Sequence, residues 1–136
     1  MSKNKYYQYY QPNKKDLKDK QGDCAIRALT KFLEMSWLEA FDSLIEYARE
    51  TQQMVNSLPN IKLLMEDRNV PYVSVYKPKA KKKMTVKDFA KEYSTGKYIV
   101  YVRVGYGTHL VCVDNGKYFD TWDCGDRYVY GYWKKN

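Results

Sequence analysis

The sequence predicts an α+β fold, in which an N-terminal helical layer packs on a C-terminal antiparallel β-sheet. Between residues 23 and 68, apolar residues recur at the spacing of amphipathic helices. From residue 97 onward the period of the apolar residues falls to two, and the segments are rich in tyrosine and valine. Helices that precede strands, without alternation between the two, are typical of this fold class.

A chain of 136 residues with 44% hydrophobic residues can build one domain around a single core. We expect this domain over residues 21–136. Residues 1–20 are rich in lysine and tyrosine without periodicity, which predicts a basic, aromatic arm that is flexible or lies over the domain. No apolar run approaches the roughly 20 residues that cross a bilayer and no signal peptide opens the chain, so a cytoplasmic protein without a membrane partner is expected.

Capping residues and turn residues predict where the individual helices and strands begin and end. The helices are expected to begin at Asp23, Ser36, Pro59 and Thr85. Asp23 can act as the N-cap of the first helix, and Ser36 with Glu39 has the three-residue spacing of a capping box. The strands are expected over residues 71–76, 97–104, 108–114, 117–121 and 127–133. Asn115-Gly116 is the strongest hairpin signal in the chain.

Cys24 is the first candidate for chemistry, because it falls in the first turn of a predicted helix. The helix dipole and the unpaired N–H groups of such a turn favour a thiolate and lower the pKa of the thiol. A small, buried hydrophobic residue is the alternative interpretation of a free cysteine. Arg27 stands one helical turn further along, where it can bind an acidic substrate group or form a structural ion pair.

His109 is the single histidine of the chain and begins a predicted strand, where catalytic groups often emerge. If Asn115 and Gly116 form a two-residue turn, His109 pairs with Trp122. Asp120 then lies diagonal to the histidine on the same face of the hairpin. A thiolate, a histidine base and an acid that orients the base are the groups that thiol hydrolysis needs.

The order of a cysteine at a helix start, a histidine at a strand start and a carboxylate on the next strand resembles the papain-like cysteine peptidases. Asp120-Thr121-Trp122 is similar to their Asn-Ser-Trp motif, and Gly131-Tyr132-Trp133 is similar to the Gly-Tyr that follows it. Over roughly residues 21–133 the chain also resembles a set of small phage and bacterial proteins with an Asp-Cys-x-x-Arg-Ala start and an Asp-Thr-Trp-Asp end.

The resemblance implies a papain-like fold and a thiol hydrolase that cleaves or transfers an amide, peptide or isopeptide bond. The expected triad is Cys24 as nucleophile, His109 as base and Asp120 as orienting acid, with Asp123 as the reserve third member. The reserve is needed because one bulge after Asp120 would change which carboxylate faces the histidine.

The resemblance also implies a side chain that donates a hydrogen bond to the oxyanion. Papain-like enzymes place a glutamine shortly before the cysteine, but Lys18 occupies that position here. Gln21 is the nearby glutamine and the predicted donor, together with the backbone N–H of Cys24, and a solvated loop residue is the alternative. Trp122 is expected to shield the hydrogen bond between acid and histidine, beside the substrate.

Three cysteines and one histidine limit the metal and disulfide sites that the chain can build. An odd number of scattered cysteines fits neither a disulfide framework nor the paired spacing of a zinc site. Cys112 is assigned to the core, and Cys124 to an exposed turn without a catalytic role. A tetrahedral metal site would need all three cysteines with His109, so no metal and no cofactor are expected.

The formal charge of +8 at pH 7 is unevenly distributed. One basic cluster contains Lys77, Lys79, Lys81, Lys82 and Lys83, and a second cluster lies in the arm. Such patches attract acidic proteins or nucleic acids without specifying which, and a solvated loop is the alternative.

Three classes of function follow from these observations. A thiol hydrolase acting on a protein or peptide substrate is the leading prediction. The alternative is a catalytically inactive papain-like binding protein, such as a phage-encoded inhibitor of a host protein that acts in the host cytoplasm. A nucleic-acid-binding domain that uses the arm and the lysine cluster is the third class.

Overall fold

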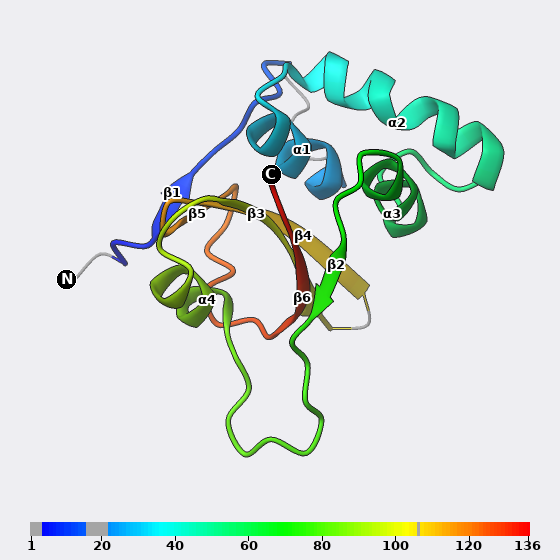
Figure 1. Ribbon diagram of the computed structural model, residues 1–136. Helices are drawn as coiled ribbons and strands as arrows, with labels where there is room; N and C mark the ends of the chain where they lie inside the picture. Colours follow the sequence, from blue (N-terminus) through cyan, green and yellow to red (C-terminus); the bar gives the residue numbers. More distant parts are fainter. Residues whose placement is uncertain (1–3, 16–21, 106) are drawn as a thin grey trace.

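The structure is a computed structural model that describes residues 4–15, 22–105 and 107–136. These residues form an α+β fold with four helices and one six-stranded mixed sheet (Figure 1). In chain order the elements are β1 (Tyr7–Tyr9), α1 (Cys24–Leu33), α2 (Trp37–Thr51), α3 (Leu58–Asp67), β2 (Tyr72–Ser74), α4 (Val86–Glu92), β3 (Lys97–Val104), β4 (Gly107–Asp114), β5 (Lys117–Asp120) and β6 (Val129–Lys134).

The sheet has the strand order β1-β5-β4-β3-β6-β2 and differs from the prediction in two ways. It is mixed instead of antiparallel, because β1 runs parallel to β5. It also includes β1, from residues predicted as an arm, beside β2, which lies within the strand expected over residues 71–76. Both are edge strands of three residues, and β1 is too short for a periodic pattern to reveal it.

Part of the predicted arm therefore lies along the domain. The strand β1 pairs Tyr7 with Tyr118 of β5, and their rings lie 5.6 Å apart. The backbone N–H of Tyr10 continues the contact by donating to the carbonyl of Asp120 at 2.9 Å. The remainder of the arm, residues 1–3 and 16–20, lies outside the described residues.

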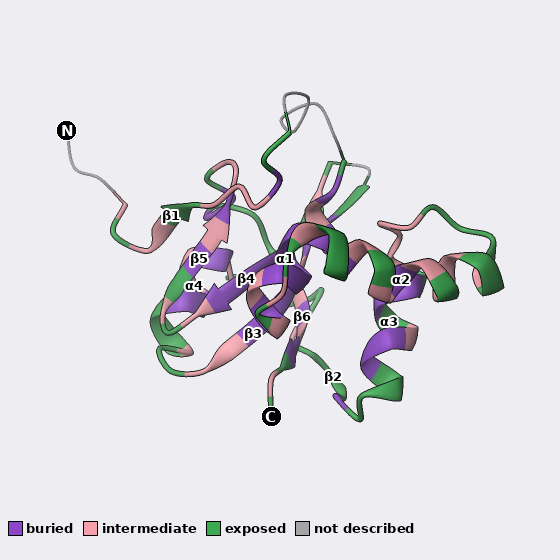
Figure 2. Cartoon of the chain, turned by 90° about the horizontal axis from the view of Figure 1, so that it is seen from above, coloured by how far each residue is buried: buried purple, intermediate pink, exposed green. Residues whose placement is uncertain are grey.

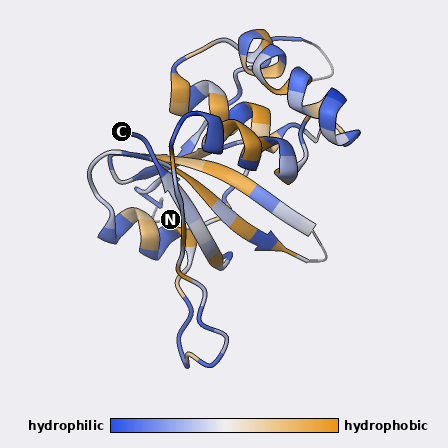
Figure 3. Ribbon diagram, turned by 45° about the vertical axis from the view of Figure 1, so that its right-hand side comes forward, coloured by the Kyte–Doolittle hydropathy of each residue, from blue (hydrophilic) through white to orange (hydrophobic). Residues whose placement is uncertain are grey.

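Helices cover both faces of the sheet, whereas the sequence predicted one helical layer. Residues of α1, α2 and α3 pack with Ile99, Leu110, Cys112 and Trp133. Residues of α4 pack on the other face, with the alternate side chains of β3 and β4 such as Val100 and Val111. The central strands are consequently buried and apolar, as Figures 2 and 3 show, while α2 exposes most of its outer surface. Among the described helices, none is long and apolar enough to cross a membrane.

The hairpin between β4 and β5 has the predicted turn. Asn115 and Gly116 both have positive φ values, 47° and 79°, as a two-residue type I′ turn requires. Asp114 pairs with Lys117, so the predicted register is confirmed. The paired part of this ladder ends at Cys112 and Phe119, so the predicted pairing of His109 with Trp122 is not formed.

The predicted capping box of the second helix is confirmed. The Ser36 hydroxyl accepts from the Glu39 N–H at 3.1 Å, and the Glu39 carboxylate accepts from the Ser36 N–H at 3.0 Å. We expect Ser36→Ala to lower the free energy of unfolding by about 1 kcal/mol in urea denaturation, because one N–H group of the first turn loses its partner. Ser94→Ala, in an exposed turn, is the control and should change it by less than half as much. Equal losses of unfolding free energy in the two variants would contradict the assignment of Ser36 as the N-cap of α2.

Candidate active site

Three residues from separate elements meet where the first turn of α1 reaches the open end of the β4–β5 hairpin. Cys24 is the first residue of α1, His109 lies in β4 and Asp120 ends β5. The Nε2 atom of His109 lies 2.5 Å from Oδ2 of Asp120. A second hydrogen bond joins the imidazole to the Cys24 thiol, for which Nδ1 is the remaining ring nitrogen. The three side chains thus form one hydrogen-bonded chain from thiol to carboxylate.

The environment favours charge separation between Cys24 and His109. Burial opposes the charged form of both groups. For the thiol, the hydrogen bond and positive charge of His109 outweigh burial and lower the pKa of Cys24 below its usual range, with help from Asn56 and the backbone of Leu110. For the imidazole, the hydrogen bonds to Asp120 and Cys24 outweigh burial and raise the pKa of His109 to about 9. These shifts favour the thiolate–imidazolium pair over the neutral thiol and imidazole.

Asp120 is held as a carboxylate although it is only 2% exposed. Burial would raise its pKa, but the hydrogen bond and charge of His109 and the charge of Arg27 lower the pKa below its usual range. The backbone N–H of Thr121 donates to Oδ1 at 2.7 Å, and the Cys124 thiol also hydrogen-bonds the carboxylate. Its orientation toward the imidazole is therefore fixed from several sides.

Arg27 forms a buried ion-pair network rather than a contact with solvent. Its Nη2 donates to Oδ1 of Asp120 at 3.0 Å, and its Nη1 pairs with Asp23, one helical turn back. Asp23 also accepts from Nε1 of Trp37 at 2.9 Å. Of the two interpretations of Arg27, the structural ion pair is thus the one observed. Arg27 thus connects Asp23, the residue before the nucleophile, with Asp120, the acid of the candidate triad.

Asp23 was expected to be the N-cap residue of α1, which is confirmed, but its side chain does not cap the helix. Asp23 occupies the N-cap position but makes no side-chain cap bond, because its carboxylate is taken by Arg27 and Trp37. Asn56, in the loop between α2 and α3, caps the helix instead. Its Oδ1 accepts from the N–H groups of Ala25 at 2.8 Å and of Ile26 at 3.2 Å.

Asn56 also contacts the nucleophile, and sequence reasoning missed it. While Oδ1 is anchored by the helix, Nδ2 lies 3.5 Å from the sulfur of Cys24. The backbone N–H of Cys24 is the donor of the first turn that Asn56 leaves unused. An asparagine 32 residues away in a helix–helix loop carries no periodic or motif signal, so only the packing of α1 against that loop reveals it.

A groove of about 510 Å³ opens beside the nucleophile. It is lined by Gly22, Cys24, Asn56, Thr108 and Leu110, and by residues 53–54 and 57–59. The thiol is partly exposed, whereas His109 is 7% exposed behind it. Trp122 packs on the imidazole with ring centroids 5.0 Å apart, and the Arg127 guanidinium lies 5.6 Å from the Trp122 ring. A substrate can thus reach the sulfur from one side while the His109–Asp120 bond stays covered.

The other predicted site residues lie elsewhere or outside the described chain. Gln21 lies outside the described residues. Asp123 hydrogen-bonds Tyr118 and the Gly125 N–H, so it does not serve the histidine. Cys124 was placed in an exposed turn, but it is fully buried, since its turn folds under the sheet beside Tyr118 and Asp120. Cys112 lies in the core as expected, and burial raises its pKa to about 12.

His109, Asp120 and Cys124 bring possible metal-ligand atoms within 4.8 Å of one another. However, His109 and Asp120 already bond each other, and Cys124 donates to Asp120 as a neutral thiol because burial and that carboxylate raise its pKa. A metal ion here would have to break the hydrogen bond that orients the imidazole. The donor set therefore fits an acid–base chain better than a coordination site.

Comparison of the chain with protein-family models, with curated proteins and with solved structures finds no match.

Proposed function

We propose that this protein is a papain-like thiol hydrolase that cleaves or transfers the acyl group of an amide, peptide or isopeptide bond. The observation that carries the proposal is the buried hydrogen-bonded chain from Cys24 through His109 to Asp120, with its sulfur on a groove. Nucleophile, base and orienting acid have the relations that this chemistry requires. Protein or peptide is the proposed substrate.

The reaction begins from the ion pair. The Cys24 thiolate attacks the carbonyl carbon, forming a C–S bond and an oxyanion. As the oxyanion collapses and the C–N bond breaks, the His109 imidazolium gives its Nδ1 proton to the leaving amine. His109 then takes a proton from water, whose oxygen attacks the thioester and releases the carboxylic acid and the thiolate. Asp120 holds Nε2–H throughout, so Nδ1 remains the nitrogen that exchanges protons.

Asn56 and the backbone N–H of Cys24 are the proposed oxyanion donors. Nδ2 of Asn56 lies beside the sulfur, and two helix N–H groups on its Oδ1 keep the amide from rotating. A donor fixed in advance stabilises developing charge without reorganising. In this proposal Asn56 takes the role that the sequence had given to Gln21.

The proposal is tested by alkylation of Cys24 with iodoacetamide, followed by mass spectrometry. At pH 6.5 a free thiol of pKa about 8.5 is only about 1% thiolate, so we expect Cys24 to react at least about tenfold faster than free cysteine. Cys24→Ser should remove the signal, since Cys112 and Cys124 are fully buried. His109→Ala should return the rate to that of an ordinary thiol. A wild-type rate no faster than free cysteine would contradict the hydrolase and favour the inactive binding protein.

A further inference from the structure

The loop between β2 and α4 concentrates positive charge on one projection of the molecule. No acidic residue occurs between Asp67 and Asp88. Within this stretch stand Lys77, Lys79, Lys81, Lys82 and Lys83. The loop extends away from α1, α2 and α3, so its lysines are remote from the acidic residues of those helices (Figure 1).

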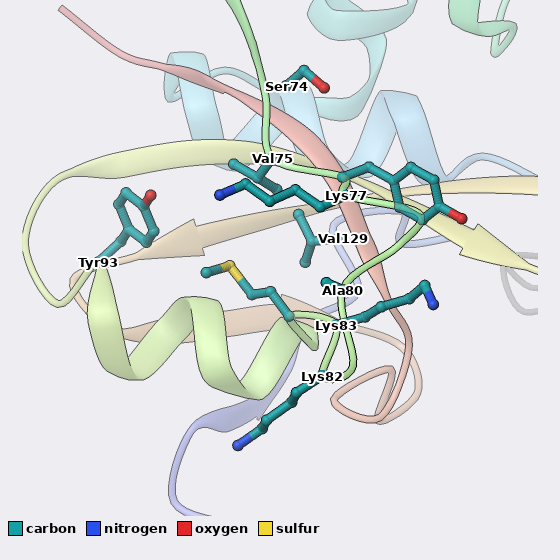
Figure 4. A pocket seen from close by; sticks show the side chains of 10 residues that line it. Ser74, Val75, Lys77, Ala80, Lys82, Lys83, Tyr93 and Val129 are labelled. Atoms are coloured by element: carbon teal, nitrogen blue, oxygen red, sulfur yellow. The ribbon is translucent and has the colours of Figure 1, made fainter.

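A hollow of about 390 Å³ lies at the base of this loop. Three lysines line it, and its floor is formed by tyrosine, methionine and valine side chains. In Figure 4, Lys77 extends across the hollow toward Tyr93, whereas Lys82 and Lys83 point outward from the loop. The hollow thus combines an aromatic wall with a cationic rim.

A second hollow of about 290 Å³ adjoins the first, because Tyr76 and Lys83 line both. Its other lining residues are Arg103, Tyr128 and Tyr130. The ring of Tyr130 is held edge-on to Tyr76 with centroids 4.7 Å apart, and its hydroxyl accepts from Arg103 at 3.0 Å. Tyr128 is 50% exposed and free to receive a flat ligand. The two hollows form one continuous basic–aromatic surface.

We infer that this basic–aromatic surface binds single-stranded nucleic acid. Lys77, Lys82, Lys83 and Arg103 supply cations for successive phosphates, and the tyrosines supply faces on which unpaired bases stack. An acidic protein would use the cations but presents an aromatic ring only at scattered positions, whereas every nucleotide of a single strand carries both a phosphate and a planar base for Tyr128 and its neighbours. No residue is shared with the groove beside Cys24, so this inference stands independently of the proposed hydrolase.

The experiment measures fluorescence anisotropy of a fluorescein-labelled oligothymidine 15-mer with the full chain. We expect saturable binding that weakens about fifty-fold between 50 and 200 mM NaCl, as release of counterions from about four phosphates requires. The combined change Lys77→Glu, Lys82→Glu, Lys83→Glu should lower the affinity by about tenfold or more. The matched control changes the net charge equally but at exposed positions elsewhere, and should lower the affinity for the oligonucleotide far less. It combines Lys14→Glu, Lys62→Glu and Lys117→Glu.

A second variant and a competitor separate base stacking from charge alone. Tyr128→Ala removes an exposed ring and should weaken the oligonucleotide about fivefold or more at constant charge. Failure to bind, or an equal loss in the loop variant and its control, would overturn the inference. If polyglutamate of the same charge competes equally and Tyr128→Ala has no effect, the surface binds acidic proteins and the nucleic-acid assignment is wrong.

Discussion

Replacing Asn56 by alanine is expected to slow the acylation of Cys24 by about 10²- to 10³-fold, the cost of losing one oxyanion donor. Acylation by p-nitrophenyl acetate measures this without knowledge of the natural substrate, because the ester passes through a tetrahedral oxyanion. Alkylation by iodoacetamide passes through no oxyanion. The ratio of the two rates therefore separates transition-state stabilisation from any change in the pKa of the thiol.

Asn56→Ala also removes the cap of α1 and a hydrogen bond to the sulfur, so a second variant is needed. Asn56→Asp keeps an oxygen for the N–H groups of Ala25 and Ile26 but replaces the donor near the sulfur with an acceptor. We expect the acylation-to-alkylation ratio to fall in both variants. Gln53→Ala, in the same groove but exposed, is the control and should leave the ratio unchanged. A ratio unchanged in Asn56→Asp would show that Asn56 serves only the helix.

Replacing Arg27 by methionine is expected to lower the free energy of unfolding by roughly 3 to 5 kcal/mol. The variant keeps most of the side-chain volume but leaves Asp23 without its cation and Asp120 with His109 alone, and both carboxylates are only 2% exposed. Urea denaturation measures the loss. Arg49→Met is the matched control, because Arg49 pairs with Glu46 on an exposed surface of α2 and should contribute less than about 1 kcal/mol. Equal losses for the two variants would contradict the buried network, and Arg27→Lys should fall between them.

The same substitution has a predicted pH signature. In the wild type the lowered pKa of Asp120 contributes stability that is present above its unfolded pKa of about 3.9 and is lost as the pH falls through the lower folded value. Without Arg27 the folded pKa of Asp120 rises toward the unfolded one. The stability difference between pH 7 and pH 3 should therefore shrink in Arg27→Met, and a general packing defect would leave it unchanged.

Much of the local structure could be predicted from the sequence, because short-range chemistry specifies it. Asn115 and Gly116 adopt positive φ at little cost, and this turn with the period of two sets the register that brings Asp120 beside His109. Ser36 and Glu39 mark the start of α2 for an equally local reason. Two of the three residues of the candidate triad thus lie on adjacent strands of one predicted hairpin, although the ladder itself ends at Cys112 and Phe119.

The helix cap at the site, the burial of Cys124 and the parallel strand depend instead on contacts between elements that are distant in the chain. Asn56, rather than Asp23, caps α1, because a loop 30 residues later packs against its first turn and Arg27 takes the carboxylate of Asp23. Cys124 is buried because its turn folds back beside Asp120. The parallel strand β1 likewise depends on an edge that exists only once β5 has formed. Patterns of period 2 and 3.6 report which face of an element is apolar, but only the assembled structure determines which polar groups meet between elements.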